Sequence, residues 1–442
     1  MSEEELLAAA QQNGNLAWVL VSAALVLFMT PGLAFFYGGM DRSRNVLNML
    51  MMNFWCLLTI PILWVTVGFS IAQGGGLFAA DDAQNFIGNG DYLFMKGMGI
   101  GDDGGTFLAT IVFLGMFAVI TPALISGAVA DRMKFSAWAV FAPLWMLLVF
   151  SPIFRWVYGG FLGDRGSLDF AGGTAIHVNA GIASLVAVLI LGKRKGWPSE
   201  GHPPHSMPLV MLGTGILWFG WFGFNAGSQL AADGRAVTAF MNTFLAAAAA
   251  GLAWCIVERL RDGHFTNLGA ASGIVAGLVA ITPGAGFVSD MSPIAIGAIA
   301  GVVCCFAVGL KTKAGYDDAL DVVGVHFVGG LVGSLLIGLF ANPEFFGDPE
   351  LFKEGLFYGG GLSLLGEQAL ANGVAMIYSA VVTGLILFAL KVTIGIRVSE
   401  DVEDAGLDLA EHSETAYHDS PGYQVSDVVE TSVGSPAPSA TV

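Results

Sequence analysis

Residues 16–36 read LAWVLVSAALVLFMTPGLAFF, a stretch without a single charged side chain. As an α-helix, about 20 apolar residues cross the ~30 Å hydrocarbon core of a bilayer. A second uncharged block, NFWCLLTIPILWVTVGFSIA, fills residues 53–72. Because the core helices of soluble proteins seldom run so far without a charge, these blocks predict membrane spans.

The composition points the same way, with 55% hydrophobic and 12% charged residues against roughly 25% charged in a typical soluble domain. A water-solvated globule of this composition would aggregate. The net charge of −17 argues against a nucleic-acid partner, because nucleic acids need basic surface. The four cysteines lie in apolar blocks without pairing or metal-ligand spacing, so they are interpreted as small hydrophobic residues. No metal or cofactor is predicted.

The remaining apolar blocks predict an all-α polytopic membrane protein with eleven transmembrane helices. A segment outside the membrane (1–15) precedes this domain (16–398), and an acidic cytoplasmic tail (399–442) follows it. Residues 420–442 have no apolar period, which predicts disorder. The expected spans are 16–40, 46–72, 106–130, 135–158, 171–191, 207–227, 235–258, 268–283, 293–311, 322–341 and 372–397.

An odd number of spans puts the two termini on opposite sides, and the distribution of Lys and Arg decides which side is cytoplasmic. With the C-terminus inside, thirteen of the eighteen basic residues fall on the cytoplasmic side. This predicts a multi-pass protein of the cell (plasma or inner) membrane with its N-terminus outside. The thirteen are Arg42, Arg44, Arg132, Lys134, Lys193, Arg194, Lys195, Arg259, Arg261, Lys311, Lys313, Lys391 and Arg397.

The string IHVNAGIASL (176–185) aligns with VHFVGGLVGS (325–334), which indicates an internal repeat. In both strings the histidine follows a β-branched residue, and each lies in the fifth span of a set of five. Because five is odd, the second set must run inverted in the membrane. We therefore expect two inverted five-helix repeats, about 16–191 and 207–341, plus a final helix. Inverted repeats tend to bring equivalent residues together near the midplane.

His177 and His326 are the two histidines that lie in the middle of predicted spans. Each could be a core histidine bonded to a neighbouring helix, but ionisable groups at this depth are costly and usually line a pathway. A neutral imidazole pair can accept hydrogen bonds from a small donor and relay a proton. Since a bare ion would find little coordination there, the pair favours a hydrogen-bonding substrate over Na⁺ or K⁺.

Asp169 opens the fifth span, eight residues before His177. Its carboxylate could cap the helix, stabilise a nearby cation, or do both. Phe117 and Phe224 lie in the third and sixth spans, where they could form a gate or simply fill the core. The string GWFGFNAGS (220–228) is an aromatic run that ends in a hydroxyl. Aromatic faces attract cations by ~0.5–2 kcal/mol, so such a run could concentrate cations at an entrance.

Four strings together resemble the Amt/Mep/Rh ammonium transporter family over residues 15–418, nearly the whole chain. They are specific as a set, and the first two favour the Amt branch over the Rh branch. The strings are LFMTPGLAFFYGG (27–39), DFAGGT (169–174) leading to His177, GWFGFNAGS (220–228) and GVH (324–326).

The resemblance implies a homotrimer in which each subunit has its own pore for ammonium or ammonia, with methylammonium as a further candidate. It also implies residue roles by motif match. These are pore histidines His177 and His326, gate residues Phe117, Phe224 and Phe113, and an external ammonium site with Trp221, Ser228 and the nearby carboxylate Asp169.

Two further stretches bear on the vestibule and on regulation. The family usually has Trp where RWVYGG (155–160) has Tyr158, whose ring can still face a cation and adds a hydroxyl. The strings GIRV (395–398) and GLDLAEH (406–412) resemble the family's cytoplasmic tail, which packs under the trimer and helps engage PII signal proteins. The alternative is a solvated acidic tail.

These observations predict a transporter that recruits ammonium outside, deprotonates it, and conducts ammonia past the gate and the histidines with net charge movement. The main alternative is an ammonium sensor that signals through its tail. The tail of about forty-five residues is too short for an added domain. A membrane hydrolase using His and Asp is the weakest reading, because no Ser or Cys nucleophile neighbours the histidines in sequence. We therefore expect no enzyme activity.

Overall fold

The computed structural model describes residues 2–75, 86–101, 104–199 and 201–417; the stretch 420–442, expected to be disordered, lies outside them. Within the described residues, eleven helical spans are long and apolar enough to cross a membrane, which confirms the predicted fold class. They are built from α1 (Glu3–Met40), α2 (Val46–Leu63) with α3 (Phe69–Gln73), α4 (Thr106–Val129), α5 (Phe135–Trp145) with α6 (Ser151–Val157) and α7 (Phe161–Asp164), α8 (Asn179–Leu191), α9 (Met207–Ala226), α10 (Gly234–Asp262), α11 (Asn267–Ile281), α12 (Ser292–Ala307) with α13 (Leu310–Ala314), α14 (Val328–Phe340) and α15 (Ser363–Thr393).

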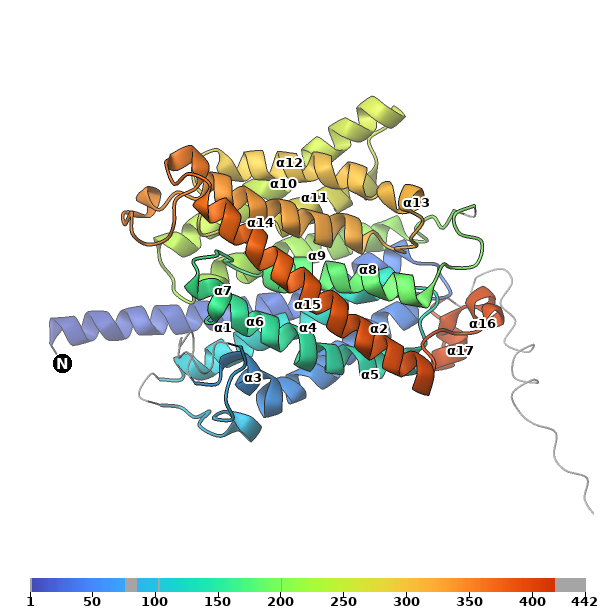
Figure 1. The fold of residues 1–442 in the computed structure, drawn as a ribbon, viewed down its shortest axis with the longest axis horizontal. Coiled ribbons are helices and arrows are strands. Elements are labelled where there is room, and N and C mark those ends of the chain that lie inside the picture. Colours follow the sequence, from blue (N-terminus) through green and yellow to red (C-terminus); the bar gives the residue numbers. More distant parts are fainter. Residues whose placement is uncertain (1, 76–85, 102–103, 200, 418–442) are drawn as a thin grey trace, which may run out of the picture.

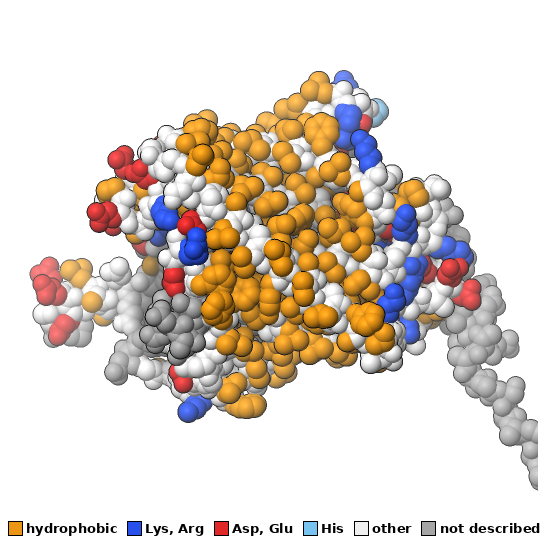
Figure 2. All heavy atoms as spheres, viewed as in Figure 1, with side chains coloured by type: hydrophobic (Ala, Val, Ile, Leu, Met, Phe, Trp, Pro, Cys, Tyr) orange, Lys and Arg blue, Asp and Glu red, His pale blue; other side chains and the backbone are white. Residues whose placement is uncertain are grey.

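The surface has the band pattern of a membrane protein. Figure 2 shows hydrophobic side chains covering the middle of the molecule, with charged side chains gathered at both ends. The N-terminal end of α1 projects from one end, while α16 (Glu400–Ala405) and α17 (Leu407–His412) lie at the other (Figure 1). The two termini of the described chain therefore lie on opposite sides, as an odd number of spans requires.

Two helices begin earlier than the apolar blocks predict. Helix α1 starts at Glu3 because Ser2 and Glu5 form a capping box, in which each side chain accepts a bond from the other's backbone N–H. The sequence predicts a separate segment over residues 1–15, but most of these residues form the first turns of α1. Helix α15 starts at Ser363 rather than 372. The polar side chain of Gln368 fits inside it because its amide donates to the Leu168 carbonyl and accepts from the Leu168 N–H.

Glycine rows bring α10 close to α11 and α12. The Cα atoms of Gly277, Gly297 and Gly301 lie so near the Ala246 and Ala250 backbone that a Cβ would not fit. Small residues allow this approach where no hydrophobic force drives helices together in lipid. The close packing of α10 against α11 and α12 therefore depends on these glycines.

The fifth and tenth spans each begin with a turn of π-helix, η5 (Gly173–Val178) and η7 (Val323–Phe327). The two turns contact each other, and the first helices of the two sets, α1 and α9, also pack together. This pairwise meeting of equivalent elements is what an inverted repeat produces. Single π-turns are frequent at functional sites, and each of these turns carries one of the midspan histidines.

The tail is docked rather than solvated over α16 and α17. Asn45 Oδ1 accepts from the Leu407 N–H, and Asp408 accepts from the Asn48 N–H, both at 2.8 Å. Glu411 accepts from the Phe135 N–H at 3.1 Å. Leu407 and Asp408 are buried. The alternative of a freely solvated tail is therefore wrong for these two helices.

Candidate functional site

The structure brings the two midspan histidines together. His177 on η5 and His326 on η7 face each other with their Nδ1 atoms 3.3 Å apart. Their rings are nearly parallel, with an interplanar angle of 22° and centroids 5.3 Å apart. Both side chains are buried, at 1% and 3% exposure. Two neutral imidazoles at this distance share one proton between their Nδ1 atoms.

Tyr37 fixes which nitrogens carry protons. Its hydroxyl donates to the Leu124 carbonyl at 3.2 Å and lies 3.5 Å from His326 Nε2. The hydroxyl oxygen is then the acceptor for a proton on His326 Nε2, so His326 Nδ1 accepts from His177 Nδ1. This assignment, made from the hydrogen-bond network, leaves a free lone pair on His177 Nε2. That atom has no partner among the described residues.

A small inner cavity surrounds the histidine pair. Its volume of about 10 Å³ holds about one water-sized molecule. No charged side chain contributes to its lining. The lining residues are His177, His326, Trp221, Phe224, Met29, Leu33, Ile120, Leu124, Ile176, Leu217 and Val275.

Two phenylalanine rings separate this inner cavity from an outer one. Phe117 and Phe224 lie with centroids 4.4 Å apart and planes at 33°. Phe224 lines the inner cavity and Phe117 the outer one. Phe113 packs edge-on against Phe117 at 4.9 Å. The three predicted gate residues therefore form one aromatic layer between the two spaces.

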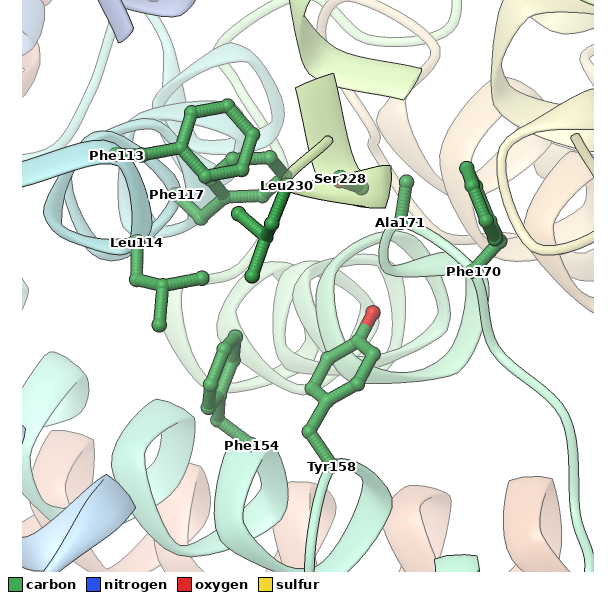
Figure 3. A pocket seen from close by; sticks show the side chains of 9 residues that line it. All are labelled: Phe113, Leu114, Phe117, Phe154, Tyr158, Phe170, Ala171, Ser228 and Leu230. Carbon is green, nitrogen blue, oxygen red and sulfur yellow. The ribbon is translucent and has the colours of Figure 1, made fainter. Parts of the chain in front are cut away.

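The outer cavity has a volume of about 50 Å³ and is mostly apolar. Figure 3 shows the Tyr158 hydroxyl pointing into it from the C-cap of α6, with Ser228 on the opposite wall. Ser228 Oγ donates to the Phe224 carbonyl at 2.8 Å, which leaves its lone pairs free to accept. The lining residues are Phe113, Leu114, Phe117, Phe154, Tyr158, Phe170, Ala171, Ser228 and Leu230.

Trp221 lies deeper than the motif match implies. It lines the inner cavity and not the outer one, with its ring stacked on His177 at 5.5 Å. Its indole N–H donates to Thr282 Oγ1 at 2.8 Å. The reason is helical rise, since Trp221 precedes Ser228 by about two turns of ~5.4 Å each. The outer site therefore contains Tyr158 and Ser228 without Trp221.

Asp169 caps the π-turn that carries His177. Its carboxylate accepts from the N–H groups of Gly172, Gly173, Thr174 and Ala175 at 2.7–3.1 Å. Burial raises the pKa of this carboxyl, and the four amide bonds oppose that rise. It does not line either cavity, but its charge lies near Tyr158 on the wall of the outer cavity. Capping is therefore its direct role.

Asp318 is a functional candidate that sequence reasoning missed. It lies eight residues before His326 and accepts from the Val323 N–H at 2.7 Å, so it caps the π-turn of the second repeat. Burial raises the pKa of its carboxyl to about 6. The signal was available, because the spacing from Asp318 to His326 equals that from Asp169 to His177.

Fold and site together define a polytopic helical membrane transporter with an uncharged, histidine-lined interior. Residues 17–417 match the model of the Ammonium Transporter Family. The chain is 50% identical to an ammonium transporter of Mycobacterium tuberculosis H37Rv, covering 92% of this chain and 90% of that one. This chain belongs to the Ammonium Transporter Family, and the predicted resemblance is confirmed.

Two solved structures have the same fold. The crystal structure of Saccharomyces cerevisiae Mep2 has a TM-score of 0.82 and 35% identity, covering 93% of this chain and 92% of that one. A structure titled "Sensor Amt Protein" has a TM-score of 0.83 and 28% identity, covering 92% of this chain and all of that one. The conserved architecture thus spans relatives described as transporters and one described as a sensor.

Proposed function

We propose that this protein transports ammonium by recruiting the cation in the outer cavity, deprotonating it and conducting ammonia along the histidine pair. The family and its curated relatives support ammonium as the substrate. The observation that carries the mechanism is the buried contact between His177 and His326. It lies in a space without charged lining, where a neutral hydrogen-bonding molecule is accommodated far better than an ion.

Recruitment relies on aromatic faces and two oxygens. The rings of Phe117 and Tyr158 can face an ammonium ion, and the free lone pairs of Ser228 Oγ can accept one of its N–H bonds. The negative charge of Asp169 lies near Tyr158 and favours a cation in this cavity. The cavity is small enough to strip most of the hydration shell.

Deprotonation follows from the cost of moving the charge further. The layer of Phe117 and Phe224 offers no oxygen ligands, and rings alone cannot replace the hydration of a fully buried ion. Ammonia carries no charge and still has N–H donors. One of them can bond the free lone pair of His177 Nε2, so the neutral form passes where the cation cannot.

The proton takes a separate route along the same histidines. Water carries the proton lost by ammonium past the rings to His177 Nε2, the shared Nδ1 proton shifts to His326, and His326 Nε2 releases its own proton past the Tyr37 hydroxyl to water on the far side. Each imidazole then carries one proton, on the nitrogen that had none before. Both rings must return to their first tautomer before the next transfer. Net charge then crosses the membrane although the nitrogen travels as ammonia.

Orientation and assembly complete the proposal. Blue side chains concentrate on the end that carries α16 and α17 (Figure 2), which supports a cytoplasmic C-terminus by the positive-inside rule. The protein would then span the cell membrane with its N-terminus outside the cell. The resemblance to the family supports a homotrimer with one pore per subunit, and a tail that can engage a PII signal protein.

The decisive measurement is ammonium-evoked current in proteoliposomes, with ammonia flux recorded in parallel by internal pH. Wild type should give a current that potassium does not inhibit, and His177→Ala or His326→Ala should abolish it. A wild type that carries ammonia without current would refute the charge-moving mechanism and leave a passive ammonia channel.

Sensing is the second candidate, favoured by the likeness to the sensor protein and by the docked tail. A sensor would bind ammonium without carrying enough to support growth. Growth on limiting ammonium of cells that lack other ammonium transporters separates the two functions. Growth restored by this chain supports transport, and failure to grow despite normal membrane insertion supports sensing.

A further inference from the structure

Arg235, on the first turn of α10, lies in a cage of four phenylalanine rings. The cage is close on every side, with each ring centroid within 6 Å of the guanidinium carbon. The distances are 4.8 Å to Phe287, 5.3 Å to Phe170, 5.4 Å to Phe352 and 5.6 Å to Phe346. A guanidinium in this position is attracted by the negative faces of the rings.

The rings and one carbonyl are the partners of this side chain. Arg235 Nε donates to the Gly286 carbonyl at 2.8 Å. No carboxylate of the described residues forms an ion pair with it. Asp233, two residues earlier, instead caps α10 and accepts from the Arg235 backbone N–H. The arginine is therefore placed by aromatic contacts rather than by a salt bridge.

The cage joins three connections that are far apart in sequence. Phe170 precedes η5, and Phe287 belongs to the connection between α11 and α12. Phe346 and Phe352 belong to the connection between α14 and α15. The rings also touch one another, with Phe170 to Phe287 at 5.5 Å and Phe287 to Phe352 at 4.9 Å. Arg235 thus holds together the loops on the side of the outer cavity.

One ring belongs to both the cage and the outer cavity. Phe170 lines that cavity (Figure 3) while its ring packs against both Arg235 and the Gly286 backbone, where a Cβ would not fit. Its N–H donates to the Pro283 carbonyl at 2.9 Å. The preceding residue is Asp169, the cap of η5. Displacing Phe170 therefore moves the cavity wall and the cap together.

We propose that Arg235 is a positioning residue for ammonium recruitment: it holds Phe170, and through it the wall of the outer cavity. The inference rests on the proposed function. Phe117, Phe224 and the histidine pair do not touch Arg235, so conduction should be spared. Loss of the cage should raise the half-saturating ammonium concentration and leave the maximal current within twofold of wild type.

The sign of the effect separates positioning from simple electrostatics. Arg235 is a cation near a cation-binding cavity, so removing its charge alone would lower the half-saturating ammonium concentration. Arg235→Gln should instead raise it by about fivefold, as loss of several cation–π contacts implies. Arg235→Lys keeps the charge but loses the planar fork, and should give an intermediate rise. Arg165→Gln, which removes an exposed arginine on the same side paired with Glu367, is the matched control.

Phe352→Leu weakens the cage and leaves Arg235 itself and every residue that lines the outer cavity unchanged. It should raise the half-saturating concentration in the same direction. The double variant Arg235→Gln/Phe352→Leu should fall short of the product of the single effects, because both remove the same contact network. This pair decides the matter even if Arg235→Gln fails to reach the membrane, in which case Arg235→Lys replaces it in the cycle.

The results separate this inference from the proposed function. A wild type without ammonium current or ammonia flux contradicts the proposed function itself. If wild type transports but Arg235→Gln leaves the half-saturating concentration unchanged or lowers it, the positioning role is wrong. Strictly multiplicative effects of Arg235→Gln and Phe352→Leu would also overturn it.

Discussion

Asp169 and Asp318 hold equivalent places at the two ends of the pore. Each lies eight residues before a pore histidine and caps the π-turn that carries it. The two caps differ in completeness, because Asp169 accepts four amide bonds while Asp318 Oδ1 has no hydrogen-bond partner in the described chain. A buried carboxylate with an unused acceptor is costly, and such groups in membrane proteins usually serve function.

The raised pKa of Asp318, about 6, fixes a pH dependence of stability. The folded state holds this proton more tightly than the unfolded state, whose Asp pKa is about 3.9. The resulting stabilisation is complete below pH ~4 and is lost as pH rises through 6. Asp318→Asn should therefore be more stable than wild type at pH 7.5, by on the order of 1–3 kcal/mol, and should gain nothing at pH 4.

The same Asp318→Asn variant should transport less ammonium at pH 7.5, because the negative charge below His326 is gone. Thermal unfolding in detergent and proteoliposome current measure the two effects. Asp321→Asn is the control, since Asp321 is partly exposed and paired with Lys311 and does not cap η7. A variant that gains stability and keeps full current would show that the charge has no part in transport.

The spans were predictable because charge and apolar length alone decide which segments can cross a membrane. The histidine pair was also within reach, since the internal repeat placed both rings in equivalent spans. The π-turns were not, because nothing in residues 173–178 or 323–327 distinguishes a π-helical turn from an α-helical one. The depth of Trp221 required the register of α9, and the cage of Arg235 forms from three loops that carry no common sequence signal.

Removing the Tyr37 hydroxyl should slow the proton route while the fold stays intact. In Tyr37→Phe, His326 Nε2 loses its oxygen acceptor. A lost hydrogen bond of ~0.5–1.5 kcal/mol corresponds to a drop in current of up to about tenfold. Tyr378→Phe removes a comparable hydroxyl, bonded to the Leu148 carbonyl away from the cavities, and should leave the current unchanged. Equal currents for wild type and Tyr37→Phe would remove Tyr37 from the relay.

Tyr158 should set the affinity for ammonium through both its ring and its hydroxyl. Tyr158→Phe keeps the ring but removes the hydroxyl oxygen that points into the outer cavity, and should raise the half-saturating ammonium concentration a few-fold. Tyr158→Ala also removes the ring face, whose ~0.5–2 kcal/mol corresponds to a further ~2–30-fold. Concentration series of ammonium-evoked current measure both. Tyr92→Phe, on a tyrosine outside the cavity lining, is the control, and an unchanged Tyr158→Ala would exclude the outer cavity as the recruitment site.

The docked tail contains two groups whose protonation should act in opposite directions. Asp408 Oδ1 accepts from the Asn48 N–H at 2.8 Å, and His412 Nε2 lies 2.9 Å from Asn48 Oδ1. Burial raises the pKa of Asp408 to about 6 and lowers that of His412 below its usual value. Docking therefore favours a protonated Asp408 and a neutral His412, so acidification strengthens docking through the first group and weakens it through the second.

Replacing either Asp408 or His412 should reveal how tail docking responds to protonation of the other residue. Between pH 7.5 and 5.5, His412→Gln should dock its tail more tightly, because only Asp408 still gains a proton. Asp408→Asn should release its tail over the same range, because only His412 does. Hydrogen exchange of residues 400–412 measures docking, and the two variants should shift in opposite directions from a nearly flat wild type. Glu400→Gln, an exposed change at the start of α16, should behave as wild type. Shifts of the same sign in both variants would mean that other groups control the tail.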